Sequence, residues 1–349
     1  MNHLLWRLSG ASLFVGQLVD QAQRGVSVVV SARHNAPQDL ADRICQSLHG
    51  EGLPVDLIST TSPPLEAVGK TLCCDAGFHS LDSICDACNG LRCFVVDIQT
   101  PDDAMRWSQF LLRLQHRARQ NPVSQRPVLV LIHRCAWPVD ATPEDVASTS
   151  LSWDDALSKA DLVSFSHALL ARRKLPGVLG RVLVHTLAEI CLTDIELMQA
   201  MCGEALDEMA LPYQSLRVWA QDRGFDQAPP RVYMDGELLD HAAWLAWTND
   251  REGLRRRIWA AQVRVLLPWV EEQRMRLLDE LILWLPTEYE GQVRHEMEVG
   301  TLDFVLSRSA APPLLKSKIR MLKTARNDMA HRRIVSYLNL QALSRIENA

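Results

Sequence analysis

The residues best suited to chemistry lie near the end of the chain, in the segment Arg326-Asn327-Asp328-Met329-Ala330-His331. His331 is suited to act as a general acid or base near neutral pH. Arg326 is suited to hold a phosphate with two parallel hydrogen bonds and to stabilise the charge that develops on it. Asn327 would orient one of these two side chains. The combination predicts cleavage of RNA by the neighbouring 2′-hydroxyl group, without a metal ion.

Helical geometry determines which of these side chains meet. At about 100° per residue, Asn327 and His331 share a face of a helix, whereas Arg326 lies about 140° away from His331. The guanidinium group therefore reaches the histidine only through its long side chain or through a local distortion of the helix. The alternative interpretation is an ordinary helix in which His331 is a cap or a core residue.

The surrounding segment is basic, with seven basic residues and one acidic residue between positions 316 and 333. A cluster of positive charge attracts a phosphate backbone and so favours RNA as the ligand. The cations expected to bind RNA are Lys316, Lys318, Arg320, Lys323, Arg332 and Arg333.

The charge distribution separates the C-terminal third from the rest of the chain. The net charge of −5 argues against a protein that coats nucleic acid with a basic surface. Residues 250–349 contain 17 Lys and Arg against 13 Asp and Glu, a balance of +4, so residues 1–249 carry −9. This asymmetry makes the C-terminal third the part suited to an RNA-facing role.

Length and composition indicate an ordinary globular protein. The 349 residues exceed what one hydrophobic core usually covers, and 47% of them are apolar and 23% charged. No export signal opens the sequence, and no apolar run approaches the roughly 18 to 20 residues of a membrane span. The nine cysteines then favour free thiols in a reducing compartment. We expect a soluble, cytoplasmic protein of two or three domains that contacts no membrane.

The first part of the chain alternates strands with helices. The β-branched run at residues 26–31 is long enough for a buried parallel strand. Further strands are predicted at residues 54–58, 92–98 and 127–132, separated by helical patterns such as that of residues 102–119. The alternation predicts an open parallel α/β sheet over about residues 10–135.

Two features of this predicted sheet bear on nucleotide binding. Asp97 ends a hydrophobic strand, as a metal-binding aspartate would. Residues 32–39, which follow the first strand, contain neither the glycines nor the lysine that a phosphate loop needs. The domain thus resembles an ATPase-type domain of the P-loop class that has lost its phosphate loop. The alternative is a structural α/β domain in which Asp97 is a strand-end residue.

A cluster of cysteines suggests a structural zinc site. Cys85 and Cys88 have the spacing that lets two thiolates reach one zinc ion. Cys73 and Cys74 are the further candidate ligands, but as neighbours they point in different directions, so four ligands would require one of them together with His79 or Cys93. The alternative is a set of free cysteines that are buried or lie in loops.

The remainder of the chain has helical spacing throughout. We predict an α/β domain at residues 1–150, a helical connector at residues 151–236 and an all-α domain at residues 237–349. The last of these contains Pro268 inside a long apolar pattern, so either two helices meet there or one helix is kinked.

The segment from Leu322 to His331 is similar to the Arg-x4-6-His signature of HEPN domains, including the polar residue after Arg326 and the alanine before His331. The similarity covers about residues 250–349 and implies an all-α domain. It further implies a homodimer in which two motifs face each other and form one metal-independent ribonuclease site. Many HEPN domains belong to prokaryotic antiviral defence or toxin systems, and some are scaffolds without nuclease activity.

These observations lead to a main prediction and to two alternatives. The main prediction is a HEPN-type endoribonuclease of a prokaryotic defence or toxin system, with RNA as its substrate and no cofactor at the cleavage site. The first alternative is a non-catalytic interaction protein of a multi-protein defence complex, which uses the motif only for dimerisation or for docking a partner protein. The second is a zinc-stabilised nucleic-acid sensor.

Overall fold

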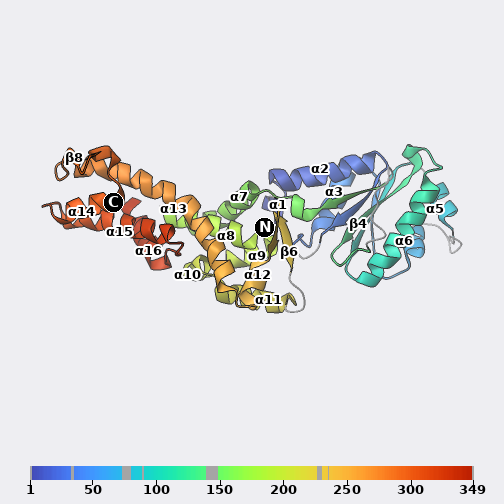
Figure 1. Cartoon of the computed structure of the whole chain (residues 1–349). Coiled ribbons are helices and arrows are strands. Elements are labelled where there is room, and N and C mark those ends of the chain that lie inside the picture. Colours follow the sequence, from blue (N-terminus) through green and yellow to red (C-terminus); the bar gives the residue numbers. More distant parts are fainter. Residues whose placement is uncertain are drawn as a thin grey trace. The chain divides into compact units, whose positions relative to one another are not determined.

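The computed structural model describes residues 2–32, 35–72, 80–88, 90–138, 148–225, 230–234 and 236–347. The chain divides into two compact units, whose elements are labelled in Figure 1. The first unit comprises residues 1–161, with the short segments 193–196 and 233–238. The second comprises residues 162–192, 197–232 and 239–349.

In the described part of the first unit, five parallel strands form one sheet in the order β2-β3-β4-β1-β5. They are β1 (Ser27–Ser31), β2 (Val55–Ile58), β3 (Arg92–Ile98), β4 (Pro127–His133) and β5 (Ser148–Ser152). The predicted open parallel α/β sheet is therefore confirmed. The sequence patterns do not predict β5, because Ser-Thr-Ser-Leu-Ser lacks the β-branched apolar run of the other strands.

The helices of this unit precede and connect the strands. They are α1 (Asn2–Leu5), α2 (Ser9–Gln23), α3 (Leu40–Gly50), α4 (Pro64–Thr71), α5 (Leu81–Ala87), α6 (Pro101–Ala118) and the short 3₁₀ helices η1 (Val123–Gln125) and η3 (Trp153–Asp155). The start of α6 illustrates how the sequence sets these bounds. The Thr100 hydroxyl accepts a hydrogen bond from the Asp103 N–H at 3.2 Å, and Pro101 occupies the first turn, so both favour a helix start here.

Helices cover both faces of the sheet, which explains why its central strands are apolar on both sides. Val29 and Phe94 pack into the core formed with α4, α5 and α6. Val28 and Val95, which are also buried, alternate with them and so point to the opposite face. Helices α2 and α3 contact strands on that face. The two faces therefore have separate apolar cores.

The rest of the chain is mainly helical, as predicted. Its helices are α7 (Lys159–Leu170), η4 (Ala171–Arg173), α8 (Gly177–Cys191), α9 (Ile195–Met201), α10 (Leu206–Ala210), α11 (Tyr213–Asp222), α12 (Ala242–Trp247), α13 (Arg251–Leu281), η5 (Arg294–Glu296), α14 (Val299–Ser307), α15 (Pro313–Ala330) and α16 (Tyr337–Glu347). The short strands β6 (Arg231–Met234) and β7 (Glu237–Asp240) pair with each other, as do β8 (Glu288–Tyr289) and β9 (Gln292–Val293). In the part of the chain that the structure describes, no helix is both long and apolar enough to cross a membrane.

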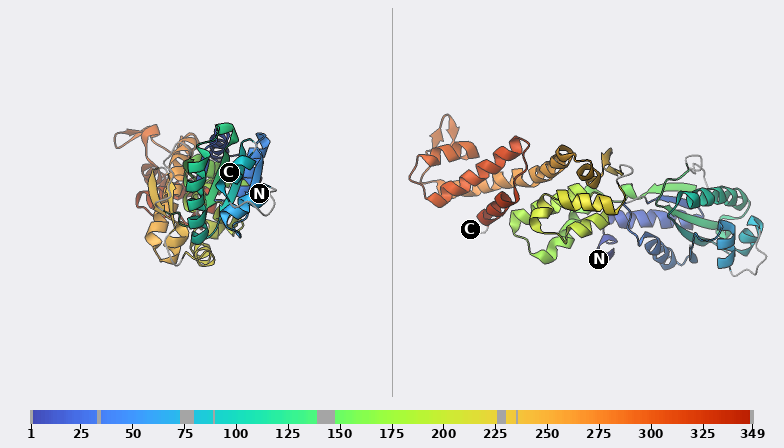
Figure 2. Two further views of the ribbon diagram at one scale, coloured as in Figure 1. Left: turned by 90° about the vertical axis from the view of Figure 1, so that its right-hand side faces the viewer. Right: turned by 90° about the horizontal axis from the view of Figure 1, so that it is seen from below.

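Helix α13 holds the second unit together, because it contacts both α8 and α15 (Figures 1 and 2). Arg264 on α13 pairs with Glu189 on α8 at 3.2 Å. The buried Gln262 side chain exchanges two hydrogen bonds with the backbone of Val335, at 3.0 and 2.7 Å. Helices α8 and α13, which lie on either side of the predicted 236/237 boundary in the sequence, therefore pack together within the second unit. Pro268 lies inside α13, and the helix continues through it.

Candidate functional site

Open α/β sheets generally bind their ligands beyond the carboxyl ends of the strands, where connections to opposite faces diverge. In this sheet the chain leaves β1 towards α3, on one face, and leaves β3 towards α6, on the other. Strand β4 lies between β1 and β3. The position at the carboxyl end of β4 is therefore the first place to look for a ligand.

Arg134 directly follows β4 and occupies this position. Its Nε donates to both carboxylate oxygens of Asp97, at 3.1 and 3.3 Å. Its two Nη atoms donate to the backbone carbonyl oxygens of Ala36, Pro37 and Gln38, at 3.0, 2.9 and 3.4 Å. The side chains of Arg134 and Asp97 are only 13% and 22% exposed, so water screens this network weakly.

The polarity of this network is opposite to that of a phosphate site. A phosphate loop directs backbone N–H groups at its ligand. The loop after β1 instead directs three carbonyl oxygens at Arg134. A phosphate in the same place would meet these oxygens and the Asp97 carboxylate, which repel it. Asp97 is thus one partner of an ion pair here, while Arg33 and His34 of the same loop lie outside the described residues.

Two more contacts fix the start of α3. The Asn35 side-chain amide donates to Asp154, which follows β5, at 3.2 Å. The Trp6 indole N–H donates to the carboxylate of Asp39, the residue that precedes α3, at 3.2 Å. The loop after β1 is therefore held from three sides, by Arg134, by Asp154 and by Trp6. Helix α3 consequently begins from a well-fixed position.

The C-terminal motif lies at the end of α15, with His331 as the C-cap residue. The chain then turns through Arg332, whose φ of 54° lies in the left-handed region. The N–H groups of Arg332 and Arg333 donate to the carbonyl oxygens of Met329 and Asp328, at 3.1 and 2.7 Å. This is the hydrogen-bond pattern of a Schellman motif, which ends the helix. The exposed His331 is therefore a cap residue rather than a core residue.

The side chains of the motif point to different partners. Arg326 pairs with Glu298, the residue before α14, with an Nη2–Oε2 distance of 2.8 Å. Asn327 and His331 are both exposed, and the His331 N–H donates to the Asn327 carbonyl oxygen at 3.0 Å. The structure thus brings Asn327 and His331 to one exposed turn. Among the described contacts, Arg326 meets Glu298 rather than His331.

Acidic residues neutralise part of the basic row along α15. Lys323 lies 2.8 Å from Asp303 on α14, and Arg320 lies 3.9 Å from the same carboxylate. The Asp303 side chain is only 16% exposed, so it is placed to hold both cations. Arg332 and Arg333 are exposed beyond the helix end. The positive potential over α15 is therefore weaker than the sequence charge suggests.

The two remaining cations of this row are directed inward. Lys318 is only 7% exposed and lies 3.9 Å from Glu280 on α13. Lys316 donates to the backbone carbonyl oxygen of Ser309 at 2.8 Å. Both ammonium groups thus help to join α15 to its neighbours in the chain.

The cysteines do not assemble a metal site within the described residues, where no group of three or more His, Cys, Asp and Glu is suited to hold a metal ion. Cys85 and Cys88 are buried at the end of α5, in the apolar core against α6. Burial raises the pKa of the Cys85 thiol, which favours the neutral form over a thiolate ligand. Cys73, Cys74 and His79 lie outside the described residues.

Cys93 on β3 allows the effect of burial on the pKa of a cysteine thiol to be tested. Burial, and then the neighbouring Cys45, raise the pKa of Cys93 from 9.0 to about 12. Because the unfolded chain releases this proton first, folding is favoured fully below pH 9 and loses that contribution as pH rises towards 12. We expect Cys93→Ala to flatten the fall in stability between these limits, by up to about 1.4 kcal/mol per pH unit. Urea unfolding of both proteins across this range measures the difference, and parallel curves would contradict the prediction.

Comparison with known proteins adds little to this geometry. No protein-family profile and no curated protein sequence matches the chain. A solved structure of Cdc6p from Pyrobaculum aerophilum is similar to it with a TM-score of 0.32 and 12% sequence identity, over 99% of this chain and 93% of that one. A TM-score this low does not establish a shared fold.

Sequence reasoning overlooks Arg134, whose guanidinium group binds Asp97 and three carbonyl oxygens at the sheet edge. Its partners, Asp97 and residues 36–38, are far from it in sequence, so no local motif marks it. One signal was available in the sequence: Arg134 directly follows the buried strand β4, and Asp97 lies near the end of β3, the strand beside it. In a parallel sheet these two strand ends lie on the same edge.

Proposed function

We propose that this chain is a non-catalytic interaction protein, built on an α/β domain that resembles a P-loop ATPase but does not use nucleotide. The observation that carries the proposal is the Arg134 network at the carboxyl edge of the sheet. The guanidinium group is bound to Asp97 and to three carbonyl oxygens, in the place where such sheets bind a ligand. A domain that keeps its fold after losing its ligand can still serve as a surface that binds a partner protein.

The free energy needed to break the Arg134–Asp97 ion pair supports this interpretation of the α/β domain. Removing one partner of a fully buried ion pair typically costs about 3 to 5 kcal/mol, because the other charge is left uncompensated. We expect about 2 to 4 kcal/mol for the partly buried pair of Arg134 and Asp97. A nucleotide would have to displace Arg134 from Asp97 and from the loop, and then bind against oxygen atoms. The cost of that rearrangement exceeds what a few phosphate contacts return in water.

We therefore expect the purified chain to bind ATP or ADP with Mg²⁺ more weakly than a Kd of about 1 mM. Isothermal titration calorimetry measures this directly, and an Asp97→Asn variant serves as the matched control. Micromolar affinity in the wild-type chain that Asp97→Asn reduces would overturn the proposal, since Asp97 would then hold a metal and not only Arg134.

A second candidate function is the HEPN-type ribonuclease of a defence or toxin system. It is favoured by one specific observation, the exposure of Asn327 and His331 on the same turn. The Arg326–Glu298 pair does not oppose it strongly, because the side chains are 39% and 59% exposed. Such exposed pairs contribute only about 0 to 1 kcal/mol, so a phosphate can compete for the guanidinium group. This function also requires RNA as the substrate and a homodimer that joins two motifs.

The same motif allows the two functions to be separated. Incubation of the wild-type chain with total RNA in EDTA, beside His331→Ala and Arg326→Ala, tests for metal-independent cleavage. The interaction proposal expects no difference among the three proteins. Cleavage by the wild type that both substitutions abolish would replace it with the ribonuclease, and analytical ultracentrifugation of the same samples would then show whether the active form is a dimer.

A further inference from the structure

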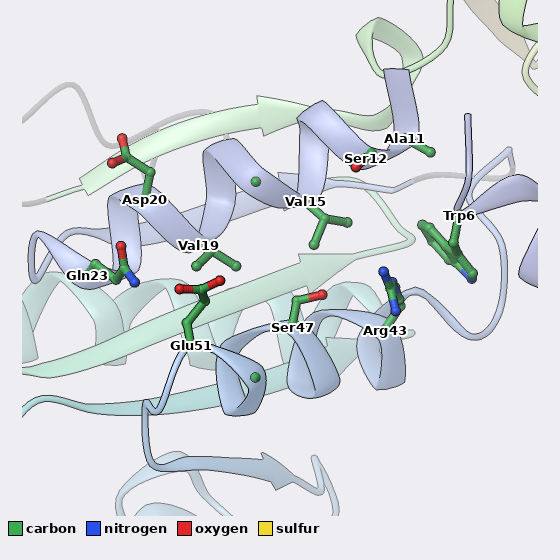
Figure 3. A pocket seen from close by; sticks show the side chains of 12 residues that line it. Trp6, Ala11, Ser12, Val15, Val19, Asp20, Gln23, Arg43, Ser47 and Glu51 are labelled. Atoms are coloured by element: carbon green, nitrogen blue, oxygen red, sulfur yellow. The ribbon is translucent and has the colours of Figure 1, made fainter. Parts of the chain in front are cut away.

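A groove with a volume of about 510 Å³ lies between α2 and α3 in the first unit (Figure 3). Val15 and Val19 from α2, both nearly buried, and Ser47 from α3 project into it (Figure 3), and Gly16 also lines it. Among the described residues of the first unit, no element fills it. A groove of this size between two helices is large enough for the side chains of a third element.

The two ends of the groove carry opposite charges. Arg43 lies at one end, with its guanidinium carbon 6.0 Å from the centre of the Trp6 ring (Figure 3). Its Nε is buried and has no hydrogen-bond partner among the described residues. Glu51 and Gln23 lie at the other end (Figure 3). A matching ligand therefore carries an acidic group at one end and a basic group at the other.

The packing of the described residues does not require glycine at Gly16 or Gly50, which line the groove. A Cβ atom at Gly16 or at Gly50 would meet nothing within 4 Å. Glycine inside a helix nevertheless lowers its stability by roughly 0.5 to 1 kcal/mol relative to alanine. Both residues lie in helices and have negative φ angles, which alanine adopts equally well. Their absence of a side chain leaves room for close approach from outside.

The geometry favours a helix over an extended peptide as the ligand. An extended peptide gains affinity mainly by pairing its backbone with an open strand edge. The walls of this groove are helices, whose backbone groups are already paired internally. A helix needs only an apolar face and close approach, which small residues permit. Glu51 is the C-cap residue of α3 and lies eight positions after Arg43, which corresponds to about 12 Å along the groove, or two helical turns.

We propose that the α2–α3 groove binds an amphipathic helix of a partner protein, which carries an acidic residue and, two turns away, a basic residue. The proposal rests on the proposed interaction function and names the class of partner. The loop that Arg134, Asp154 and Trp6 hold leads into α3, so the same contacts that close the sheet edge also fix one wall of the groove.

Three synthetic helical peptides test the proposal on the full chain. Each has about 15 residues and a side-chain staple, because shorter unconstrained helices are marginal in water. All share one leucine face, and their end residues are Glu and Lys, Lys and Lys, or Glu and Glu. We expect fluorescence anisotropy to show that the Glu and Lys peptide binds at least about fivefold more tightly than the other two.

Variants of the groove make the test specific. Glu51→Lys, at an exposed position, should transfer the preference to the Glu and Glu peptide, and Arg43→Glu should transfer it to the Lys and Lys peptide. Gly16→Leu should weaken every peptide at least about tenfold by filling the groove. Leu13→Ala, on the same helix and 66% exposed but outside the groove, should change nothing.

The outcomes separate this proposal from the proposed function. No binding of any peptide at about 1 mM, or unchanged affinity in Gly16→Leu, overturns the groove as a helix site. Equal affinity of the three peptides for the wild-type chain overturns the charge argument, and with it the stated partner. Nucleotide binding at the sheet edge, measured separately, overturns the interaction function without affecting these results.

Discussion

Replacing Arg134 with alanine is expected to lower the free energy of unfolding of the sheet by about 2 to 4 kcal/mol. The substitution leaves the Asp97 carboxylate, at 22% exposure, without its cation, and it leaves three carbonyl oxygens of the loop after β1 without a donor. Arg134→Lys should recover only part of the loss. A single ammonium group cannot reach both the carboxylate and the loop as a planar guanidinium group does.

Amide hydrogen exchange in β1 and β3 measures this loss locally, so the second unit does not obscure it. The matched control is Arg113→Ala, because Arg113 is an exposed arginine on α6 in the same unit. Exposed substitutions of this kind usually change stability by less than about 0.5 kcal/mol. If the amides of β1 and β3 are equally protected from exchange in Arg134→Ala and in Arg113→Ala, the ion pair does not stabilise the sheet edge. The argument that Arg134 blocks the nucleotide position then fails as well.

The second large effect is expected at Gly10, in the first turn of α2. An added Cβ atom there would overlap the carbonyl oxygen of Ala156 and lie 2.7 Å from a carboxylate oxygen of Asp161. The backbone of Ala156 cannot move aside without displacing the chain after η3. We therefore expect Gly10→Ala to destabilise the first unit by about 3 kcal/mol, as overpacking against a fixed neighbour does.

Gly16, in the same helix, provides the control for the same substitution. A Cβ atom at Gly16 meets nothing within 4 Å, so Gly16→Ala should stabilise α2 by about 0.5 to 1 kcal/mol. Thermal unfolding followed by circular dichroism should shift in opposite directions for the two variants. A loss of stability in both would mean that α2 tolerates no side chain at either glycine, which would contradict the open groove.

Local sequence patterns predicted the centre of the first unit's sheet well because its central strands are buried on both faces. The apolar, β-branched runs of β1, β3 and β4 are visible without any tertiary information. The pattern of β5 is different, since its serines are strand residues only because β1 pairs with them. The predicted boundary at residues 236 and 237 depended on helix-breaking residues. No local pattern reports how helices from either side of it, such as α8 and α13, pack together.

The candidate sites show the same division between local and distant information. The spacing of Asn327 and His331 was enough to predict that they share a face, and in the structure they lie on one exposed turn. The partner of Arg326 was not predictable, because Glu298 belongs to another element. The basic row of α15 was visible in the sequence, whereas its neutralisation by Asp303 depends on how α14 packs.

The sequence by itself determined an α/β domain without a phosphate loop, followed by helices that end in a basic segment with an Arg-x4-His motif. These features depend on residue type and on spacing within one element, which obey the fixed periods of strands and helices. Only the tertiary structure decided that Arg134 occupies the sheet edge and that a groove with charged ends lies between α2 and α3. Both arise from side chains brought together from distant segments, and such contacts are set by packing rather than by period.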